Sequence, residues 1–154
     1  MALRDELKQV KPFRSLEEEA TLNVTRTSAI LEHALIQALK PHAITPTQYN
    51  VLRILRGSGG DGLCRNEVGQ RMVRQVPDVT RLLDRMEQIG LIARVRSRDD
   101  RRFVSTHLTP KGRSLVDRLD DEVGAIHRRH LGHLGESQLK QLVELLTKAR
   151  APES

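Results

Sequence analysis

The sequence predicts a mainly α-helical fold with one small β-hairpin, and three observations support this. Apolar residues recur every three or four positions through most of the chain, as on the buried face of a helix. Two extended runs, residues 91–96 and 103–108, stand on either side of a polar segment of six residues. A short helical segment stops at Gly90, directly before the first run, where a left-handed residue would close a helix. A helix followed at once by a hairpin with a cationic tip has the outline of a winged helix-turn-helix.

Capping residues mark the starts of two long helices. Ser15 stands three residues before Glu18, the pattern of a capping box, and the helix that it opens extends to about Lys40. Thr45 opens a second helix in the same way, with Pro46 at the first helical position. The first helix carries an apolar stripe made of Leu16, Ala20, Val24, Leu31, Leu35 and Leu39.

The rest of the chain divides into four more helices, the hairpin and their connections. The expected order is a loop at 57–62, a helix at 64–72, a turn at 73–76, a helix from Pro77, the hairpin, a helix from Thr109 through Ile126 and a helix from Glu136 to about Arg150. In the helix that begins at Pro77, helical spacing predicts a buried face made of Val79, Leu82, Leu83, Met86 and Ile89.

The 154 residues are most simply one domain. Within it, residues 45–109 are expected to form a winged-helix core, and residues 1–44 and 110–154 to form dimerisation helices. The first and last long helices both carry apolar stripes, and stripes of that size are costly to leave in water on a soluble monomer. The sequence therefore predicts a homodimer. The alternative is that both helices fold back on their own protomer.

The charge of the chain points to an acidic partner. The net charge is +6 and the isoelectric point is near 10.1. Between Arg94 and Arg102 there are five arginines and two aspartates, all in or beside the hairpin. Aromatic residues make up only 2% of the chain, which disfavours a platform that stacks single-stranded or RNA bases. Duplex DNA is the partner that fits best.

Several other classes of protein are disfavoured. One cysteine cannot form an intramolecular disulfide or a Cys-rich zinc module. No apolar run approaches the ~20 residues that span a bilayer, and residues 1–13 lack a signal-peptide core. The glycines at 57–62 lack the lysine of a phosphate-binding loop, and no catalytic constellation is visible. We therefore expect a cytoplasmic protein with no membrane partner, no cofactor and no enzymatic activity.

Three segments together resemble the MarR family (multiple antibiotic resistance) of transcriptional regulators. Thr45 to Tyr49, TPTQY, is similar to the family's "LTPxQ" helix start. Residues 79–87 and 90–92 are similar to its recognition helix and exit, and residues 100–102 with 108–112 to its wing signature and following helix. The resemblance covers about residues 15–150, with two departures: Cys64 stands where a capping Ser or Thr is usual, and Gly69 replaces the usual Ala.

The resemblance implies a homodimeric winged-helix regulator of transcription. Such a protein dimerises through its first and last helices and binds a pseudo-palindromic operator in duplex DNA. It is often released from the DNA by a small ligand or by an oxidant. For this chain we expect a repressor that responds to a small-molecule effector. The alternatives are a winged-helix module that docks an acidic protein, and a redox-sensing regulator that uses Cys64.

The recognition helix and its entry supply the candidate DNA contacts. Arg81 and Arg85 lie on the face opposite the apolar stripe, and Arg81 is the best candidate for a bidentate contact with guanine. Gln75 and Asp78 at the helix entry are placed to read bases, while Arg74 is placed to meet phosphate. The alternative is a solvated helix face with local ion pairs.

The hairpin supplies a second set of candidates. Arg98 and Arg101 at its tip are expected to enter a minor groove, where narrow A·T-rich DNA concentrates negative potential. By resemblance to the family, Asp100 and Arg102 brace the wing, and Arg102 is expected to be a DNA contact and partly structural. The alternative is a charged tip that only protects an exposed strand edge from aggregation.

The remaining candidates concern regulation and metal binding. In the family the effector lies between the dimer helices and the DNA-reading core, and His42 and Arg53 are the polar residues here that could line that cleft. Cys64 beside Arg65 at a helix start could form a reactive thiolate, although an inert cysteine is the more common case. Three histidines, His127, His130 and His133, cluster near the end of one helix, but their spacing favours a solvated face over a metal site.

Overall fold

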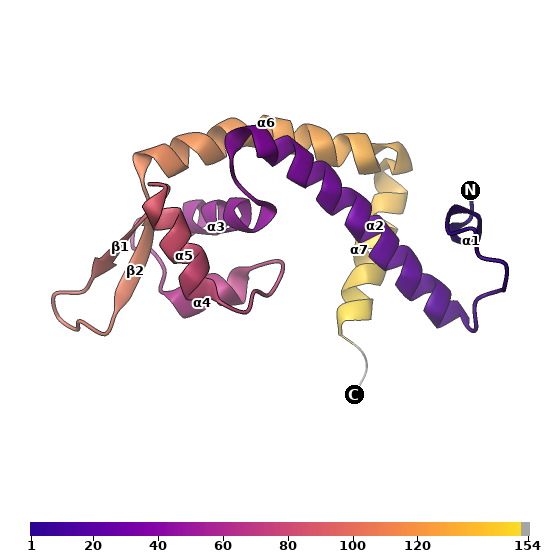
Figure 1. Cartoon of the computed structure of the whole chain (residues 1–154), viewed down its shortest axis with the longest axis horizontal. Helices are drawn as coiled ribbons and strands as arrows, with labels where there is room; N and C mark the ends of the chain where they lie inside the picture. The colour runs from indigo at the N-terminus through magenta and orange to yellow at the C-terminus, as the bar shows by residue number, and fades with distance from the viewer. Residues whose placement is uncertain (152–154) are drawn as a thin grey trace.

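The computed structural model describes residues 1–151 and has the expected helical fold with a single two-stranded hairpin. Its elements are α1 (Leu3–Glu6), α2 (Leu16–Leu39), η1 (Lys40–His42), α3 (Pro46–Gly57), α4 (Arg65–Arg71), α5 (Val79–Gln88), β1 (Ile92–Arg96), β2 (Val104–Leu108), α6 (Pro110–Leu131), η2 (Gly132–Leu134) and α7 (Gly135–Arg150). In Figure 1, α3, α4, α5 and the hairpin lie below the N-terminal end of α6 and form what we call the winged-helix lobe. The other end of the molecule holds α1, α7 and the N-terminal half of α2.

The helix starts predicted at Ser15 and Thr45 are confirmed, with one difference in detail, whereas the helix expected from Pro77 begins two residues later, at Val79, because Asp78 is its cap. Thr45 and Gln48 form a complete capping box, with Pro46 at the first helical position. The Ser15 Oγ accepts the Glu18 N–H at 3.1 Å, as expected. The Glu18 carboxylate, however, accepts the N–H of Arg14 and not that of Ser15, so only half of the first capping box forms.

The hydrophobic core joins the winged-helix lobe to both neighbouring long helices. Its fully buried side chains include Leu52 of α3, Leu83 of α5 and Val68 of α4. Leu39 at the end of α2 and Val116 of α6 are equally buried in the same cluster. The core therefore extends beyond residues 45–109, because the lobe uses the start of α6 and the end of α2 to close its apolar face.

The buried face of α5 is close to the prediction. Leu83 and Met86 are buried, and Val79 and Leu82 pack against the core. Ile89 was expected on this face but is 42% exposed. It occupies the C-cap, where the backbone leaves the helical path and the side chain no longer follows the helical spacing.

The end of α5 has the predicted left-handed glycine. Gly90 has φ +78°, the Leu91 N–H donates to the Met86 carbonyl at 3.0 Å, and the Gly90 N–H donates to the Glu87 carbonyl at 3.0 Å. These two bonds are those of a Schellman motif. The hairpin follows at once, with Ile92 opposite Leu108 and Arg96 opposite Val104.

The start of α6 is joined tightly to the end of α5. The Thr109 Oγ1 accepts the Gly112 N–H at 3.1 Å, which caps α6, and donates to the Gly90 carbonyl at 2.6 Å. The Lys111 ammonium donates to the Ile89 carbonyl at 2.8 Å. A Cβ on Gly112 would lie 2.1 Å from the Leu91 carbonyl oxygen, so only glycine permits this approach. The joint fixes the recognition helix against α6 at the base of the wing.

The long terminal helices leave much of their apolar surface exposed. Val24 of α2 and Val143 and Leu145 of α7 are all more than half exposed, and α7 has no buried residue. The protomer buries the C-terminal end of the α2 stripe, where Leu39 joins the core and Leu35 packs against it, but it leaves other apolar side chains of α2 and α7 exposed. This disfavours the alternative in which both helices fold back. No helix among residues 1–151 is long and apolar enough to cross a membrane.

The N-terminal segment contains a short helix that the sequence analysis did not predict. It is α1, whose Leu3 is buried and whose Arg4 donates to the carbonyls of Gln9 and Val10. Four residues are too few for helical periodicity to show. Its position depends on tertiary contacts and on Arg4.

Candidate nucleic-acid interface

Helix α5 presents two arginines on its solvent face. The Asp78 Oδ1 accepts the Arg81 N–H at 3.0 Å and so caps the helix. Arg81 and Arg85 lie on the side away from Leu83, and neither forms an ion pair within residues 1–151. The helix therefore offers two free guanidinium groups, whereas one oxygen of Asp78 is already engaged.

A polar hollow of about 640 Å³ lies between the N-terminal ends of α4 and α5. The Arg65 guanidinium donates to the Thr80 Oγ1 at 2.9 Å across it. At Gly69 an added Cβ would lie 3.2 Å from the Val79 Cγ2, so the glycine allows α4 and α5 to approach closely. The lining residues are Arg65, Asn66, Gly69, Gln70, Gln75, Pro77, Asp78, Val79 and Thr80. Gln75 and Asp78 were expected at this entry; the α4 residues were not, because their position depends on how the two helices pack.

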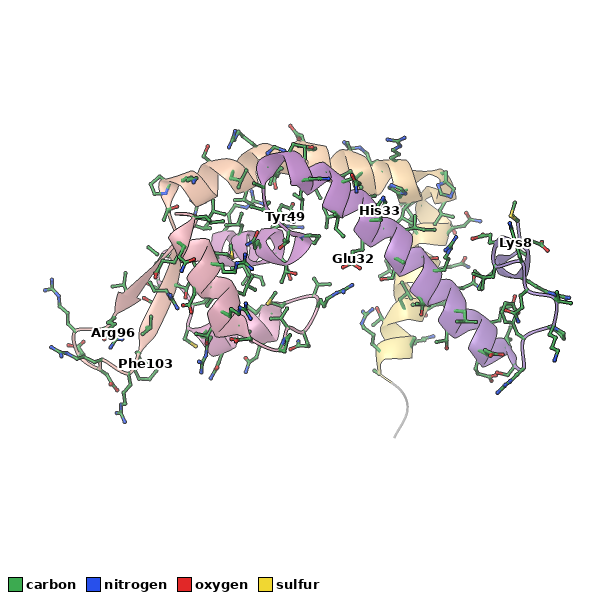
Figure 2. All side chains as sticks on the ribbon, viewed as in Figure 1. Lys8, Glu32, His33, Tyr49, Arg96 and Phe103 are labelled. Carbon is green, nitrogen blue, oxygen red and sulfur yellow. The ribbon has the colours of Figure 1, made fainter. Side chains whose placement is uncertain are left out.

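Arg74 does not stand free in the turn before α5. Its guanidinium pairs with the Glu32 carboxylate of α2 at 2.8 Å. Figure 2 shows Glu32 on the side of α2 that faces the winged-helix lobe. Arg74 must leave this partner or share it in order to meet a phosphate, and its expected role in DNA binding stays a prediction.

The tip of the wing is braced by the pair that the sequence suggested. The Arg102 guanidinium donates to both oxygens of Asp100 at 3.1 Å, and the Arg102 N–H donates to the same carboxylate at 3.0 Å. These bonds hold the pKa of Asp100 below its usual value. Arg96, Arg98 and Arg101 form no ion pair in the described part of the chain.

Arg94, also in the hairpin, has an internal role. Its guanidinium donates to the Glu87 carboxylate at 3.0 Å and contacts Asp84, so it fastens β1 to α5. The hydrogen bond with Arg94 lowers the pKa of Glu87. Fewer than five of the arginines in this region are therefore available to a partner, because Arg94 is paired with Asp84 and Glu87 of α5 and Arg102 is paired with Asp100.

Further ion pairs attach the lobe and η1 to α6. Arg56 of α3 donates to Asp117 at 2.9 Å and to both oxygens of Asp120 at 2.8 Å. These bonds raise the pKa of Arg56 and lower that of Asp120. The His42 Nε2 lies 3.0 Å from the Glu122 carboxylate.

The expected effector cleft does not coincide with any of three hollows found among residues 1–151. His42 is engaged with Glu122, and neither His42 nor Arg53 lines the α4–α5 hollow, the hollow beside Cys64 or the apolar hollow on α7. Their role in effector binding therefore stays a prediction.

Cys64 occupies the expected N-cap of α4, where Glu67 takes over part of the capping. The Glu67 carboxylate accepts the Cys64 N–H at 2.8 Å, which lowers the pKa of Glu67. Cys64 is partly exposed and lines a hollow of about 370 Å³ that also includes Arg94 and Phe103. Among residues 1–151 no three His, Cys, Asp or Glu side chains gather closely enough to hold a metal ion, so His127 and its neighbours gain no support as ligands.

Comparisons with known proteins agree with this geometry. A family model described as "MarR family" matches residues 44–104. The uncharacterized HTH-type transcriptional regulator YkoM of Bacillus subtilis (strain 168) is 30% identical over 142 residues, covering 89% of this chain and 90% of the relative. The HTH-type transcriptional repressor MdtR of the same organism is 30% identical over 146 residues, covering 94% and 93%.

A solved structure matches over the same length. The crystal structure of the S. aureus MepR–DNA complex aligns with a TM-score of 0.78 at 26% identity, covering 85% of this chain and 96% of MepR. These relatives are transcriptional regulators and not enzymes. With a capped recognition helix, a braced basic wing and these relatives, the chain belongs to the MarR family of winged-helix DNA-binding transcriptional regulators.

Proposed function

We propose that this chain is the subunit of a homodimeric repressor, which binds a pseudo-palindromic operator in duplex DNA and is released by a small-molecule effector. The observation that carries the proposal is the arrangement of free cations. Arg81 and Arg85 on α5 and Arg98 and Arg101 on the wing have no ion-pair partner within residues 1–151, and they belong to two adjoining elements of one lobe. A recognition helix in the major groove with a basic loop beside it would use both sets.

The roles within this interface follow from the contacts. Arg81 is the base-reading residue, Arg85 supports it, and Gln75 reads at the helix entry. Asp78 acts first as the helix cap, and any base contact would use its second oxygen. Arg98 and Arg101 enter the minor groove, Arg102 contributes from its brace with Asp100, and Arg74 meets phosphate after leaving Glu32.

The division of labour along the chain is also part of the proposal. Residues 45–109 read the DNA, and residues 1–44 and 110–154 hold the dimer. The exposed apolar side chains of α2 and α7 support a partner protomer as the group that covers them. As a regulator of transcription the protein would work on the chromosome, in the cytoplasm. MdtR is named a repressor, and this supports repression over activation.

Effector control would act on the spacing of the two recognition helices. Ion pairs join the lobe to the long helices: Arg74 pairs with Glu32 of α2, and Arg56 pairs with Asp117 and Asp120 of α6. The His42–Glu122 pair joins η1 to α6. A ligand among α2, α3 and α6, near His42 and Arg53, releases DNA only if it favours one spacing over another. A preference of ~100-fold supplies about 2.7 kcal/mol, enough to empty an operator.

The experiment that tests the function is a gel shift with the DNA upstream of the protein's own gene and of its neighbours. Wild type should bind one duplex in preference to a scrambled sequence, and binding should weaken steeply with salt. Arg81→Ala should cost about 1–3 kcal/mol of binding free energy and reduce discrimination at particular base pairs. Equal binding to every duplex would instead favour a module that docks an acidic protein.

The redox alternative is separable by one comparison. Cys64 lies at the start of α4, next to the hollow that α5 lines, so its oxidation could disturb the recognition helix. Peroxide should leave wild type and Cys64→Ser equally bound to DNA if a ligand is the signal. Release of wild type alone would show that the thiol is the sensor.

A further inference from the structure

Phe103, at the start of the returning strand of the wing, is an exposed aromatic residue in a chain that has very few. The chain contains two Phe, one Tyr and no Trp. Tyr49 is buried in the core, whereas Phe103 is 65% exposed. Single exposed apolar residues are common, so exposure alone decides nothing. The surroundings of Phe103 carry the argument.

Phe103 lies at the edge of a hollow, and a second exposed apolar side chain lies in the facing strand. Phe103 stands one residue before β2 and lines, with Arg94 and Thr106, the hollow of about 370 Å³ beside Cys64. Val95 of β1 is 54% exposed. The wing therefore leaves two apolar side chains exposed, and one of them stands at the rim of this hollow.

The backbone around Phe103 is held in place. The Phe103 N–H donates to the Asp100 carbonyl at 3.0 Å, and the Phe103 carbonyl accepts the Ser97 N–H at 2.9 Å. The neighbouring Arg102 is braced by both oxygens of Asp100. A ring carried on so fixed a backbone loses little conformational entropy on binding, which suits a contact residue.

The positive charges near Phe103 indicate which kind of partner its side chain would contact. Arg96, Arg98 and Arg101 lie within seven residues of Phe103 along the hairpin, and none has an ion-pair partner in residues 1–151. Figure 2 shows Arg96 and Phe103 together toward the distal end of the hairpin, far from α6. A second copy of the same tip would be repelled by its like charge. A minor groove offers phosphates at its rims and apolar sugar faces and base edges within, which complements arginines around a ring.

We propose that Phe103 is an apolar wedge of the wing, which presses into the minor groove and makes the wing sensitive to how easily the DNA deforms. The proposal rests on the proposed function and assigns to the wing a preference that its arginines alone do not supply. Partial unstacking of a base step costs least at flexible pyrimidine–purine steps such as TA. Operators with such a step under the wing should therefore be preferred.

The test uses the full-length protein and the tightest duplex that wild type selects from a randomised pool. Hydroxyl-radical footprinting locates the step under the wing, and two duplexes are then made that differ there only in TA or AA. Wild type should prefer TA by about tenfold, which corresponds to ~1.4 kcal/mol. Phe103→Ala should bind both duplexes alike, with an unchanged salt slope because no charge is removed. Phe103→Leu should restore most of the preference, since leucine also serves as a wedge.

Each result bears on the proposal. Because Phe103 is exposed, Phe103→Ala should keep the melting temperature of wild type. If Phe103→Ala retains the full preference for TA, or if wild type has no such preference, the proposed role of Phe103 as a wedge is wrong. The proposed function in DNA binding is not affected by that result. If wild type selects no duplex from the pool, the proposed function fails and the wedge fails with it. Arg101→Ala is the matched comparison: it should flatten the salt slope and keep the TA preference.

Discussion

The arginines of the hairpin have different tasks, and only some are free for a partner. Arg94 fastens β1 to Glu87 and Asp84 of α5, and Arg102 braces the tip against Asp100. Arg98 and Arg101 remain unpaired in the described residues. DNA binding should therefore depend on the positive charges of Arg98 and Arg101. It should depend on Arg94 through the position of the wing, which Arg94 fixes against α5.

The first prediction separates these roles. Arg98→Ala together with Arg101→Ala should weaken binding to many duplexes alike and reduce the slope of log K against log salt by about 2, one unit for each phosphate that is no longer neutralised. Lys140→Ala with Lys148→Ala removes the same charge from α7 and should leave the slope nearly unchanged. Equal slopes for wild type and the wing double variant, measured by fluorescence anisotropy, would show that the tip does not meet phosphate.

At the scale of elements, local signals in the sequence predicted much of the fold. The sequence identifies Ser15 and Thr45 as caps and Thr109 as a helix start, because a cap depends on residues within one turn. Gly90 and the runs on either side of residues 97–102 predicted the end of α5 and the hairpin for the same reason.

Contacts between distant segments could not be predicted in this way. Arg74 and Glu32 form an ion pair although they lie 42 positions apart in the sequence, so no local pattern predicts the pair. Arg94 was counted with the wing charges because its partners on α5 become neighbours only when β1 packs on that helix. The α4 side of the hollow between α4 and α5 was missed for the same reason.

The second prediction concerns the joint between α5 and α6. Gly112→Ala would place a Cβ 2.1 Å from the Leu91 carbonyl oxygen, a backbone atom that cannot move aside alone. The substitution should lower the free energy of unfolding by about 1–3 kcal/mol, as overpacking does. Gly124→Ala in the same helix meets only the end of the Arg128 side chain at 3.4 Å and should be neutral or stabilising. Urea denaturation measures both, and equal stabilities would contradict this description of the joint.

The third prediction concerns pH and the Arg56–Asp120 pair. The hydrogen bonds from Arg56 lower the pKa of Asp120 in the folded protein, so the ionised carboxylate stabilises the fold above the pKa of the unfolded state, ~3.9. That stabilisation is lost as pH falls through the lower, folded value. Asp120→Asn should therefore be less stable than wild type near pH 7, and the difference should shrink below about pH 4. Asp121→Asn is the control, because Asp121 forms no ion pair within residues 1–151. A difference that stays constant to about pH 2 in thermal melts would contradict the assignment.

For the whole molecule, the exposed apolar side chains of α2 and α7 are the feature that a monomer does not explain. The apolar hollow on α7, lined in part by Leu139 and Val143, adds to this surface. Leu142 and Leu146 are half-buried within the protomer, so a charged substitution there would disturb the folding of the protomer. Val143 and Leu145 are more than half exposed, so a charged substitution at these two positions tests the assembly of the dimer.

The fourth prediction is accordingly that Val143→Glu with Leu145→Glu yields a folded monomer. Burying two carboxylates in an apolar interface costs more than the interface gains, so the dimer should dissociate while the circular dichroism spectrum keeps its helical form. DNA affinity should fall sharply, because one protomer then holds only one half-site. Sedimentation of wild type as a stable monomer at micromolar concentration would refute the dimer.

The central claim is that α5 and the wing of each protomer read one half of a symmetric duplex site. Hydroxyl-radical footprinting of wild type on its preferred duplex tests it most directly. The account predicts two equivalent protected regions with centres about one helical turn, ~10 bp, apart. Minor-groove protection under each wing should lie beyond them and disappear in Arg98→Ala with Arg101→Ala. A single asymmetric footprint, or protection that does not change with salt or with the wing arginines, would contradict it.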